Sequence, residues 1–83
     1  MKEYFDNEKF AKFLKEERKS NGMSLKAIEG LTGIDHSYVN RLERGNRDNP
    51  SIKKLILLVN AYGYPFEQVK EFVKKVNTHS GWK

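Results

Sequence analysis

Apolar residues recur every three or four positions along most of this chain, as they do on the buried face of an amphipathic helix. Helix-capping and turn-forming residues interrupt this pattern and divide the chain into short segments. We therefore predict five helices, over residues 7–20, 24–31, 35–44, 51–61 and 65–76. No stretch of useful length alternates apolar and polar residues as a half-buried strand does, so the predicted fold class is all-α.

The boundaries of the central helices are marked by particular residues. Ser24, Asp35 and Ser51 stand before the second, third and fourth predicted helices, where their side chains can accept hydrogen bonds from free backbone amides. Gly33 and Gly45 follow the second and third helices, and glycine readily adopts the left-handed conformation that ends a helix. A short helix, a turn and a second capped helix in succession predict a helix-turn-helix at the centre of the domain.

The third predicted helix separates its apolar and polar residues. At about 100° per residue, Val39 and Leu42 share the side that we expect to pack on the core. The opposite side carries His36, Ser37, Asn40, Arg41 and Arg44. In the major groove of DNA, an arginine side chain can donate two hydrogen bonds to guanine, and an asparagine side chain can form two with adenine. A polar helix face is more often only solvated, so this interpretation depends on the helix-turn-helix around it.

The length and charge of the chain limit its class. Its 83 residues predict one domain, because a chain of this size cannot bury two separate cores. We assign residues 1–76 to that domain and residues 77–83, which show no periodicity, to a C-terminal tail. Lysine and arginine number 16 against 11 acidic residues, and the resulting net charge of +5 favours a polyanionic partner such as nucleic acid or an anionic membrane.

Several other functions are disfavoured. The chain has no cysteine and only two histidines in different segments, so we expect no disulfide, metal site or cofactor. Asp35, His36 and Ser37 are residue types of a hydrolase, but neighbours on a helix point in different directions, so we do not expect an enzyme. No run of about 18 apolar residues is present, and the N-terminus has no export signal, so we expect a cytoplasmic protein.

The last predicted helix has an unusually wide apolar stripe. A basic amphipathic helix can lie on a membrane, but in a domain this small we expect such a stripe to be core. Part of the stripe remains as surplus, and we predict that Phe72, Tyr64 and Val76 form a self-complementary patch for a homodimer. Two copies related by a two-fold axis would read both halves of a palindrome about one helical turn apart.

The segment GMSLKAIEGLTGIDHSYVNRLERGNRDNPSI carries a recognisable pattern. Together with the flanking residues, over residues 10–69, it resembles the Cro/C1-type (XRE) helix-turn-helix family of bacterial and phage transcription regulators. It is especially similar to repressors of the SinR kind and to controller proteins of restriction-modification systems. The resemblance implies a compact five-helix, lambda-repressor-like DNA-binding domain.

The resemblance also implies a role for each matching residue. Arg18 and Glu43 would form a partly buried ion pair that joins the first helix to the end of the third. The residues facing bases would be His36, Ser37, Asn40 and Arg41. The residues facing phosphates would be Ser24, Leu25, Lys26, Tyr38, Arg44, Asn46 and Arg47, with backbone amides contributing at the start of the second helix.

Two positions depart from the family pattern. Leu25 stands where many members have glutamine, which removes a side-chain phosphate contact. Glu29 stands where the family usually has alanine packed between the two helices of the motif. A carboxylate at this place must reach solvent or find a cation.

The sequence therefore predicts a sequence-specific regulator that binds double-stranded DNA, acting as a homodimeric repressor on a palindromic operator. A protein antagonist is a further candidate partner. The alternative is a protein-interaction module on the same fold, such as an antitoxin or anti-repressor, without DNA binding of its own. The basic residues Arg41, Arg44, Arg47, Lys53 and Lys54 favour DNA binding, because a module released from phosphate contact has no reason to keep them in one region.

Overall fold

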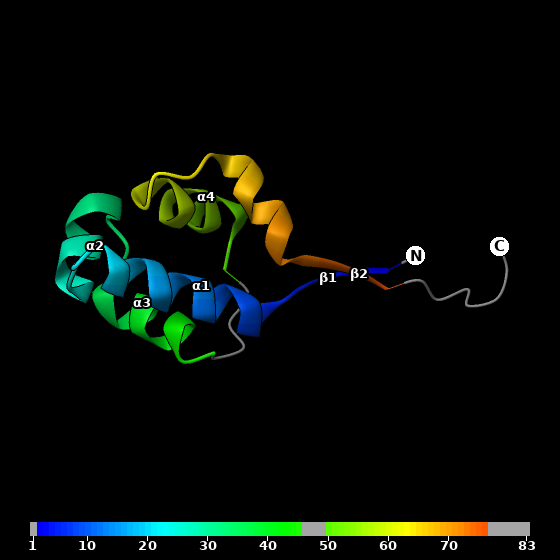
Figure 1. The fold of residues 1–83 in the computed structure, drawn as a ribbon, viewed down its shortest axis with the longest axis horizontal. Helices are drawn as coiled ribbons and strands as arrows, with labels where there is room; N and C mark the ends of the chain where they lie inside the picture. The colour runs from blue at the N-terminus through cyan, green and yellow to red at the C-terminus, as the bar shows by residue number, and fades with distance from the viewer. Residues whose placement is uncertain (1, 46–49, 77–83) are drawn as a thin grey trace, which may run out of the picture.

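The computed structural model describes residues 2–45 and 50–76, with the side chains of residues 4–45 and 50–73. Four α-helices make up the body of the described part of the chain (Figure 1). In chain order the elements are β1 (Lys2–Phe5), α1 (Asn7–Ser20), α2 (Leu25–Thr32), α3 (His36–Glu43), α4 (Ile52–Ala61), the 3₁₀ helix η1 (Phe66–Phe72) and β2 (Val73–Val76). The helical fold class and the central helix-turn-helix are as predicted from the sequence.

The helices begin where the capping residues predict. The side chain of Ser24 accepts a hydrogen bond from the amide of Ala27 at 3.0 Å, and that of Ser51 accepts one from Lys54 at 3.2 Å. Asp35 caps α3 by accepting from the amide of Ser37 at 2.9 Å. Each cap satisfies an amide that has no carbonyl partner within its own helix, so these starts are set by local chemistry.

The end of the described chain differs from the prediction. Instead of one helix over residues 65–76, the structure has the 3₁₀ helix η1 followed by β2, which pairs antiparallel with β1. Phe5 lies opposite Val73 and Lys2 lies opposite Val76 in this ribbon. The β-branched residues of β2 suit a strand once β1 supplies a partner. Each strand has only four residues, which is too short for an alternating apolar and polar pattern to be recognised in the sequence. The two strands extend away from the helices (Figure 1).

All the helices contribute to a single core. α1, α2 and α3 enclose it from one side, and α4 and η1 from the other. The buried apolar residues of this core are Phe10, Leu14, Ile28, Ile34, Val39, Leu42, Leu55, Leu58, Val59, Val69 and Phe72. Two of them, Val39 and Leu42, hold α3 on the molecule as the sequence predicts.

The predicted dimer patch is wrong at Phe72. This residue is only 2% exposed, and the centroid of its ring lies 5.0 Å from that of Phe10 and 5.0 Å from that of Phe13. In a 3₁₀ helix residues three apart share a side, so Phe72 follows Val69 into the core. Tyr64 is half-buried, and the side chain of Val76 lies outside the described residues. The surface that these three residues were expected to form is therefore not a patch around Phe72.

Candidate nucleic-acid interface

The turn between α2 and α3 is held by local hydrogen bonds. Gly33 ends α2 with a φ of 75°, in the left-handed region that glycine adopts without strain. The hydroxyl of Thr32 donates to the carbonyl of Ile28 at 2.8 Å and accepts from the amide of Ile34 at 3.1 Å. Ile34 is buried beneath the turn. These contacts fix the direction in which α3 leaves α2.

The exposed face of α3 carries the predicted base-contacting residues. Ser37 and Arg41 are exposed, whereas His36 and Asn40 are partly buried. Val39 and Leu42 lie in the core on the other side of the helix. α3 lies at one edge of the helical body, beside α1 and α2 (Figure 1). The polar residues that the sequence placed on one face are thus presented outward by the burial of two aliphatic residues.

The predicted ion pair between Arg18 and Glu43 is present. The guanidinium donates to both carboxylate oxygens, from Nε at 2.7 Å and from Nη2 at 2.9 Å, and Nη1 donates to the carbonyl of Met23 at 3.1 Å. The side chain of Glu43 is only 4% exposed and that of Arg18 17%. The hydrogen bonds to Glu43 raise the pKa of Arg18 above its ordinary value. This bidentate pair joins α1 to the last residue of α3 and limits movement of α3 on the core.

A second contact links α3 to α4. Two cations lie over the ring of Tyr38, with Nζ of Lys54 4.2 Å from its centroid and Cζ of Arg41 5.4 Å from it. The cations are attracted by the electron-rich face of the ring. Lys54, which the resemblance did not assign to the site, therefore joins the predicted phosphate-contacting Tyr38 and the predicted base-contacting Arg41 in one basic surface.

The remaining predicted phosphate contacts lie at both ends of the motif. The first turn of α2 contains Leu25, which packs partly on the core, and Lys26, whose side chain is exposed. The amides of this turn have no carbonyl partner within the helix and carry the partial positive charge of its N-terminus. Arg44 is exposed at the end of α3. Asn46 and Arg47 lie outside the described residues.

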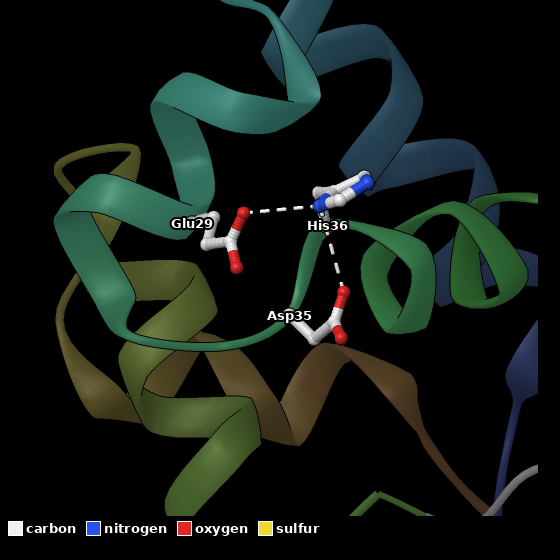
Figure 2. A group of neighbouring side chains, drawn as sticks. All are labelled: Glu29, Asp35 and His36. Atoms are coloured by element: carbon white, nitrogen blue, oxygen red, sulfur yellow. Dashed lines mark hydrogen bonds and ion pairs between the residues drawn. The ribbon is translucent and has the colours of Figure 1, made fainter.

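The structure shows which groups the carboxylate of Glu29 contacts. Its Oε1 atom lies 3.0 Å from Nδ1 of His36, the first residue of α3 (Figure 2). Nζ of Lys26 lies 4.0 Å from the same oxygen. Glu29 thus finds its partners on both helices of the motif. Sequence reasoning missed the contact between Glu29 and His36, because residues seven apart are joined here only by the turn.

Two of the predicted base-contacting residues are restrained within the protein. Nδ1 of His36 faces Glu29 and also lies 3.5 Å from Oδ1 of Asp35, so a base contact by this residue would use Nε2. The hydroxyl of Ser37 donates to Oδ1 of Asp35 at 3.0 Å, which leaves its oxygen as an acceptor. The hydrogen bonds from Ser37 lower the pKa of Asp35, because they stabilise its charged form.

Within residues 2–45 and 50–76, no helix has the length and apolar character needed to cross a membrane. The described features instead consist of a short capped helix, a fixed turn, and a second helix whose outer side is polar and basic. This combination defines a helix-turn-helix DNA-binding domain. The chain belongs to the helix-turn-helix family HTH_3, whose family model matches residues 14–69.

Similar proteins agree with this assignment. The chain is 38% identical over 66 residues to the HTH-type transcriptional regulator DdrOP3 of Deinococcus deserti, covering 80% of this chain and 50% of that protein. The fold matches the restriction-modification controller protein C.AhdI from Aeromonas hydrophila with a TM-score of 0.68 and 34% identity, over 77% of this chain and 96% of that one.

Two further solved structures are similar. An HTH_3 family transcriptional regulator from Vibrio cholerae matches with a TM-score of 0.69 and 30% identity, over 80% of this chain and 36% of that chain. The SinR protein/SinI protein complex matches with a TM-score of 0.64 and 27% identity, over 72% of this chain and 58% of the matched chain. The present chain thus spans half the length of the curated relative and about a third of the Vibrio protein.

Proposed function

We propose that this chain binds a specific sequence of double-stranded DNA and represses transcription. It acts as a homodimer on a palindromic operator, and its location is the cytoplasm. The observation that carries the proposal is the attachment of α3. Val39 and Leu42 fix α3 to the core. Arg41 is exposed, and together with Lys54 it lies over the ring of Tyr38. A helix presented in this way fits the major groove of B-DNA.

The residues divide into those that read bases and those that bind phosphates. Arg41 would donate to guanine, Asn40 would pair with adenine, and His36 and Ser37 would contact base edges at the start of α3. Phosphates would be held by the N-terminus of α2 at Ser24, Leu25 and Lys26. Further phosphate contacts would come from Tyr38, Lys54 and Arg44. We also assign phosphate contacts to Asn46 and Arg47.

An exposed apolar groove between α4 and η1 replaces Phe72 as the proposed dimer surface. It is lined by Ile52, Ile56, Phe66, Val69 and Val73, together with Glu67 and Lys70. Ile52 is 63% exposed and Phe66 57%, which is unusual for large apolar side chains in so small a domain. A second copy of the chain that places the same groove against it would cover both residues, as a two-fold interface requires.

A protein antagonist is part of the proposal. One structural neighbour, SinR, is described in a complex with the SinI protein. The α4–η1 groove offers a partner of this kind an apolar surface, since the described face of α3 is polar. If the groove binds such a partner and the chain binds no DNA, the chain is the interaction module that the sequence left as the alternative.

The test begins with selection of bound sequences from a random DNA pool. The affinity of the full chain for the selected and for random DNA is then measured by fluorescence anisotropy over a range of salt concentrations. We expect the affinity to fall steeply with salt, because phosphate binding releases counterions. Absence of a selected sequence, with weak binding to all DNA at low salt, would contradict the proposal.

The division of roles has its own test. Arg41→Ala should weaken binding to the selected sequence by about 1–3 kcal/mol and relax the preference at one base pair. Lys12→Ala removes the same charge from the exposed side of α1, beside Gln68 and Glu71 of η1, and is the matched control. Equal losses on selected and random DNA for Arg41→Ala would show that this residue binds phosphate and not a base.

A further inference from the structure

Three potential metal ligands meet where α2 and α3 are joined. Glu29 comes from α2, Asp35 is the cap of α3, and His36 is the first residue of α3 (Figure 2). We call them the α2–α3 cluster. Each offers one ligand atom, and the three atoms lie within 4.8 Å of one another. Figure 2 shows Nδ1 of His36 directed toward both carboxylates.

The distances suit a small divalent ion. Nδ1 of His36 lies 3.0 Å from Oε1 of Glu29 and 3.5 Å from Oδ1 of Asp35. An ion about 2.1 Å from each atom would have ligand angles of about 90° and about 113° for these pairs, which lie on either side of the tetrahedral value. The two carboxylate oxygens must be no more than about 4.2 Å apart for the same ion to reach both. Rotation of the partly exposed Glu29 side chain can bring its carboxylate oxygen within this distance of the Asp35 oxygen.

The donor set also indicates the class of ion. One imidazole nitrogen with two carboxylate oxygens is typical of zinc, cobalt, manganese and iron sites, whereas magnesium and calcium prefer oxygen alone. The two carboxylates carry two negative charges, and the nearby Lys26 is an exposed ammonium 4.0 Å from Glu29 that can move away. Oδ1 of Asp35 accepts hydrogen bonds from both the amide and the hydroxyl of Ser37, which use its two lone pairs. The ion would replace the bond from the hydroxyl, and the bond from the amide, which caps α3, can remain.

We propose that the α2–α3 cluster binds a divalent transition-metal ion of the zinc and cobalt class, and that the bound ion tightens the grip of the domain on DNA. The ion would replace the direct contact between Glu29 and His36, and the longer contact between Lys26 and Glu29, with metal–ligand bonds to α2 and α3. It would also cancel two negative charges beside the predicted base-contacting face. The effect on DNA rests on the function proposed above, whereas the binding of the ion does not.

The test of the site uses the full chain without DNA. Titration with Co²⁺ is followed by its visible absorption, which reports the number and geometry of protein ligands, and titration with Zn²⁺ is followed by calorimetry. We expect one ion per chain, and we expect Glu29→Gln and His36→Gln each to lower the affinity by about tenfold or more, since even residues that only support a ligand contribute about 10–100-fold. Circular dichroism checks that both variants remain folded.

Two control variants locate the ion. Glu16→Gln changes an exposed carboxylate on α1, and His79→Gln removes the other histidine of the chain. Both should bind Co²⁺ as the unchanged protein does. Equal affinity in His36→Gln and the unchanged protein, or loss of binding in His79→Gln, would overturn the site. Mg²⁺ at equal concentration should not displace Co²⁺, and displacement would overturn the assignment of the ion class.

A separate experiment tests the effect on DNA. Saturating Zn²⁺ should increase the affinity of the unchanged protein for its selected sequence, and this increase should be absent in Glu29→Gln. Binding of the ion without any change in DNA affinity would overturn the regulatory part of the proposal. If the chain binds no DNA at all, the proposed function fails, and the metal titration still decides whether the site exists.

Discussion

Arg18 and Glu43 place an ionised pair where α1 meets the end of α3. The two side chains differ in their surroundings, because Glu43 is 4% exposed and Arg18 keeps 17% exposure and a bond to the carbonyl of Met23. Removal of one partner leaves the other charge without compensation, and the free energy lost depends on how deeply that charge lies. The pair therefore has an asymmetry that stability measurements can detect.

We expect Arg18→Ala to destabilise the domain by about 3–5 kcal/mol, since it leaves a buried carboxylate unpaired. Glu43→Ala should have a smaller effect, because Arg18 retains contact with solvent and with Met23. The measurement is urea unfolding of each variant and of the double variant, which should lose less than the sum of the two single changes. Additive losses would show that the two side chains stabilise the fold independently.

Tyr62 and Tyr64 make a second matched pair. The hydroxyl of Tyr62 is buried and has no hydrogen-bond partner among the described residues, whereas that of Tyr64 donates to Glu17 at 2.8 Å. Tyr62→Phe should therefore stabilise the domain by about 1 kcal/mol, because it removes an unsatisfied polar group. Tyr64→Phe should destabilise it by a similar amount. Thermal unfolding of both variants tests the difference in sign.

The raised pKa of Tyr62 leads us to expect a loss of folding stability at alkaline pH. Burial raises the pKa of Tyr62 to about 12 from its ordinary value of 10.0. Because the folded state holds this proton more tightly than the unfolded state, its contribution is complete below pH 10 and is lost as the pH rises toward 12. Denaturant midpoints should fall across this window, and less so in Tyr62→Phe. An identical fall in both proteins would assign the alkaline loss to other groups.

At the scale of the elements, the turn between α2 and α3 depends on one backbone conformation. Gly33 has a φ of 75°, and a Cβ added there would meet no atom within 4 Å. Gly30 has the same open surroundings but lies inside α2 with an ordinary φ. A comparison of the two positions therefore separates backbone strain from steric contact.

We expect Gly33→Ala to destabilise the domain by about 1–2 kcal/mol, which is the penalty of the left-handed region for a residue with a Cβ. Gly30→Ala should stabilise it by up to about 1 kcal/mol, because alanine favours the helix interior. Chemical denaturation measures both changes. Similar values for the two variants would show that the turn does not require glycine.

How far the elements follow from the sequence depends on the distance between the interacting residues. The four α-helices of the described chain were predicted, and each follows a capping residue whose hydrogen bond joins residues only two or three apart. These caps are Asp6, Ser24, Asp35 and Ser51. The ribbon joins residues near the two ends of the chain. Each strand is only four residues long, so neither is recognisable until the fold brings the other beside it.

At the scale of the whole molecule, the positive charge and the exposed apolar surface lie on different parts of the described chain. The net charge of +5 favours DNA, and the described cations around Tyr38 gather beside α3. The α4–η1 groove lies on other elements and exposes Ile52 and Phe66. We therefore expect that DNA binding and the proposed self-association can be changed separately.

Phe66→Asp should shift the chain from dimer to monomer while leaving it folded, because it places a charge in the exposed groove. Phe72→Ala should instead destabilise the domain by about 3–5 kcal/mol, since it removes a buried ring from the core. Sedimentation equilibrium gives the mass and circular dichroism gives the folded fraction. An unchanged mass in folded Phe66→Asp would remove the groove as the dimer surface.

Local spacing in the sequence determined the four α-helices, their caps and the polar face of α3, because these depend on residues within about one helical turn of each other. The resemblance to known regulators supplied the ion pair of Arg18 and Glu43. Only the tertiary structure decided that Phe72 is core, that the chain ends pair as β1 and β2, and that Glu29 meets His36 beside Asp35. These depend on how separate elements pack, which the spacing of residues along one element does not contain.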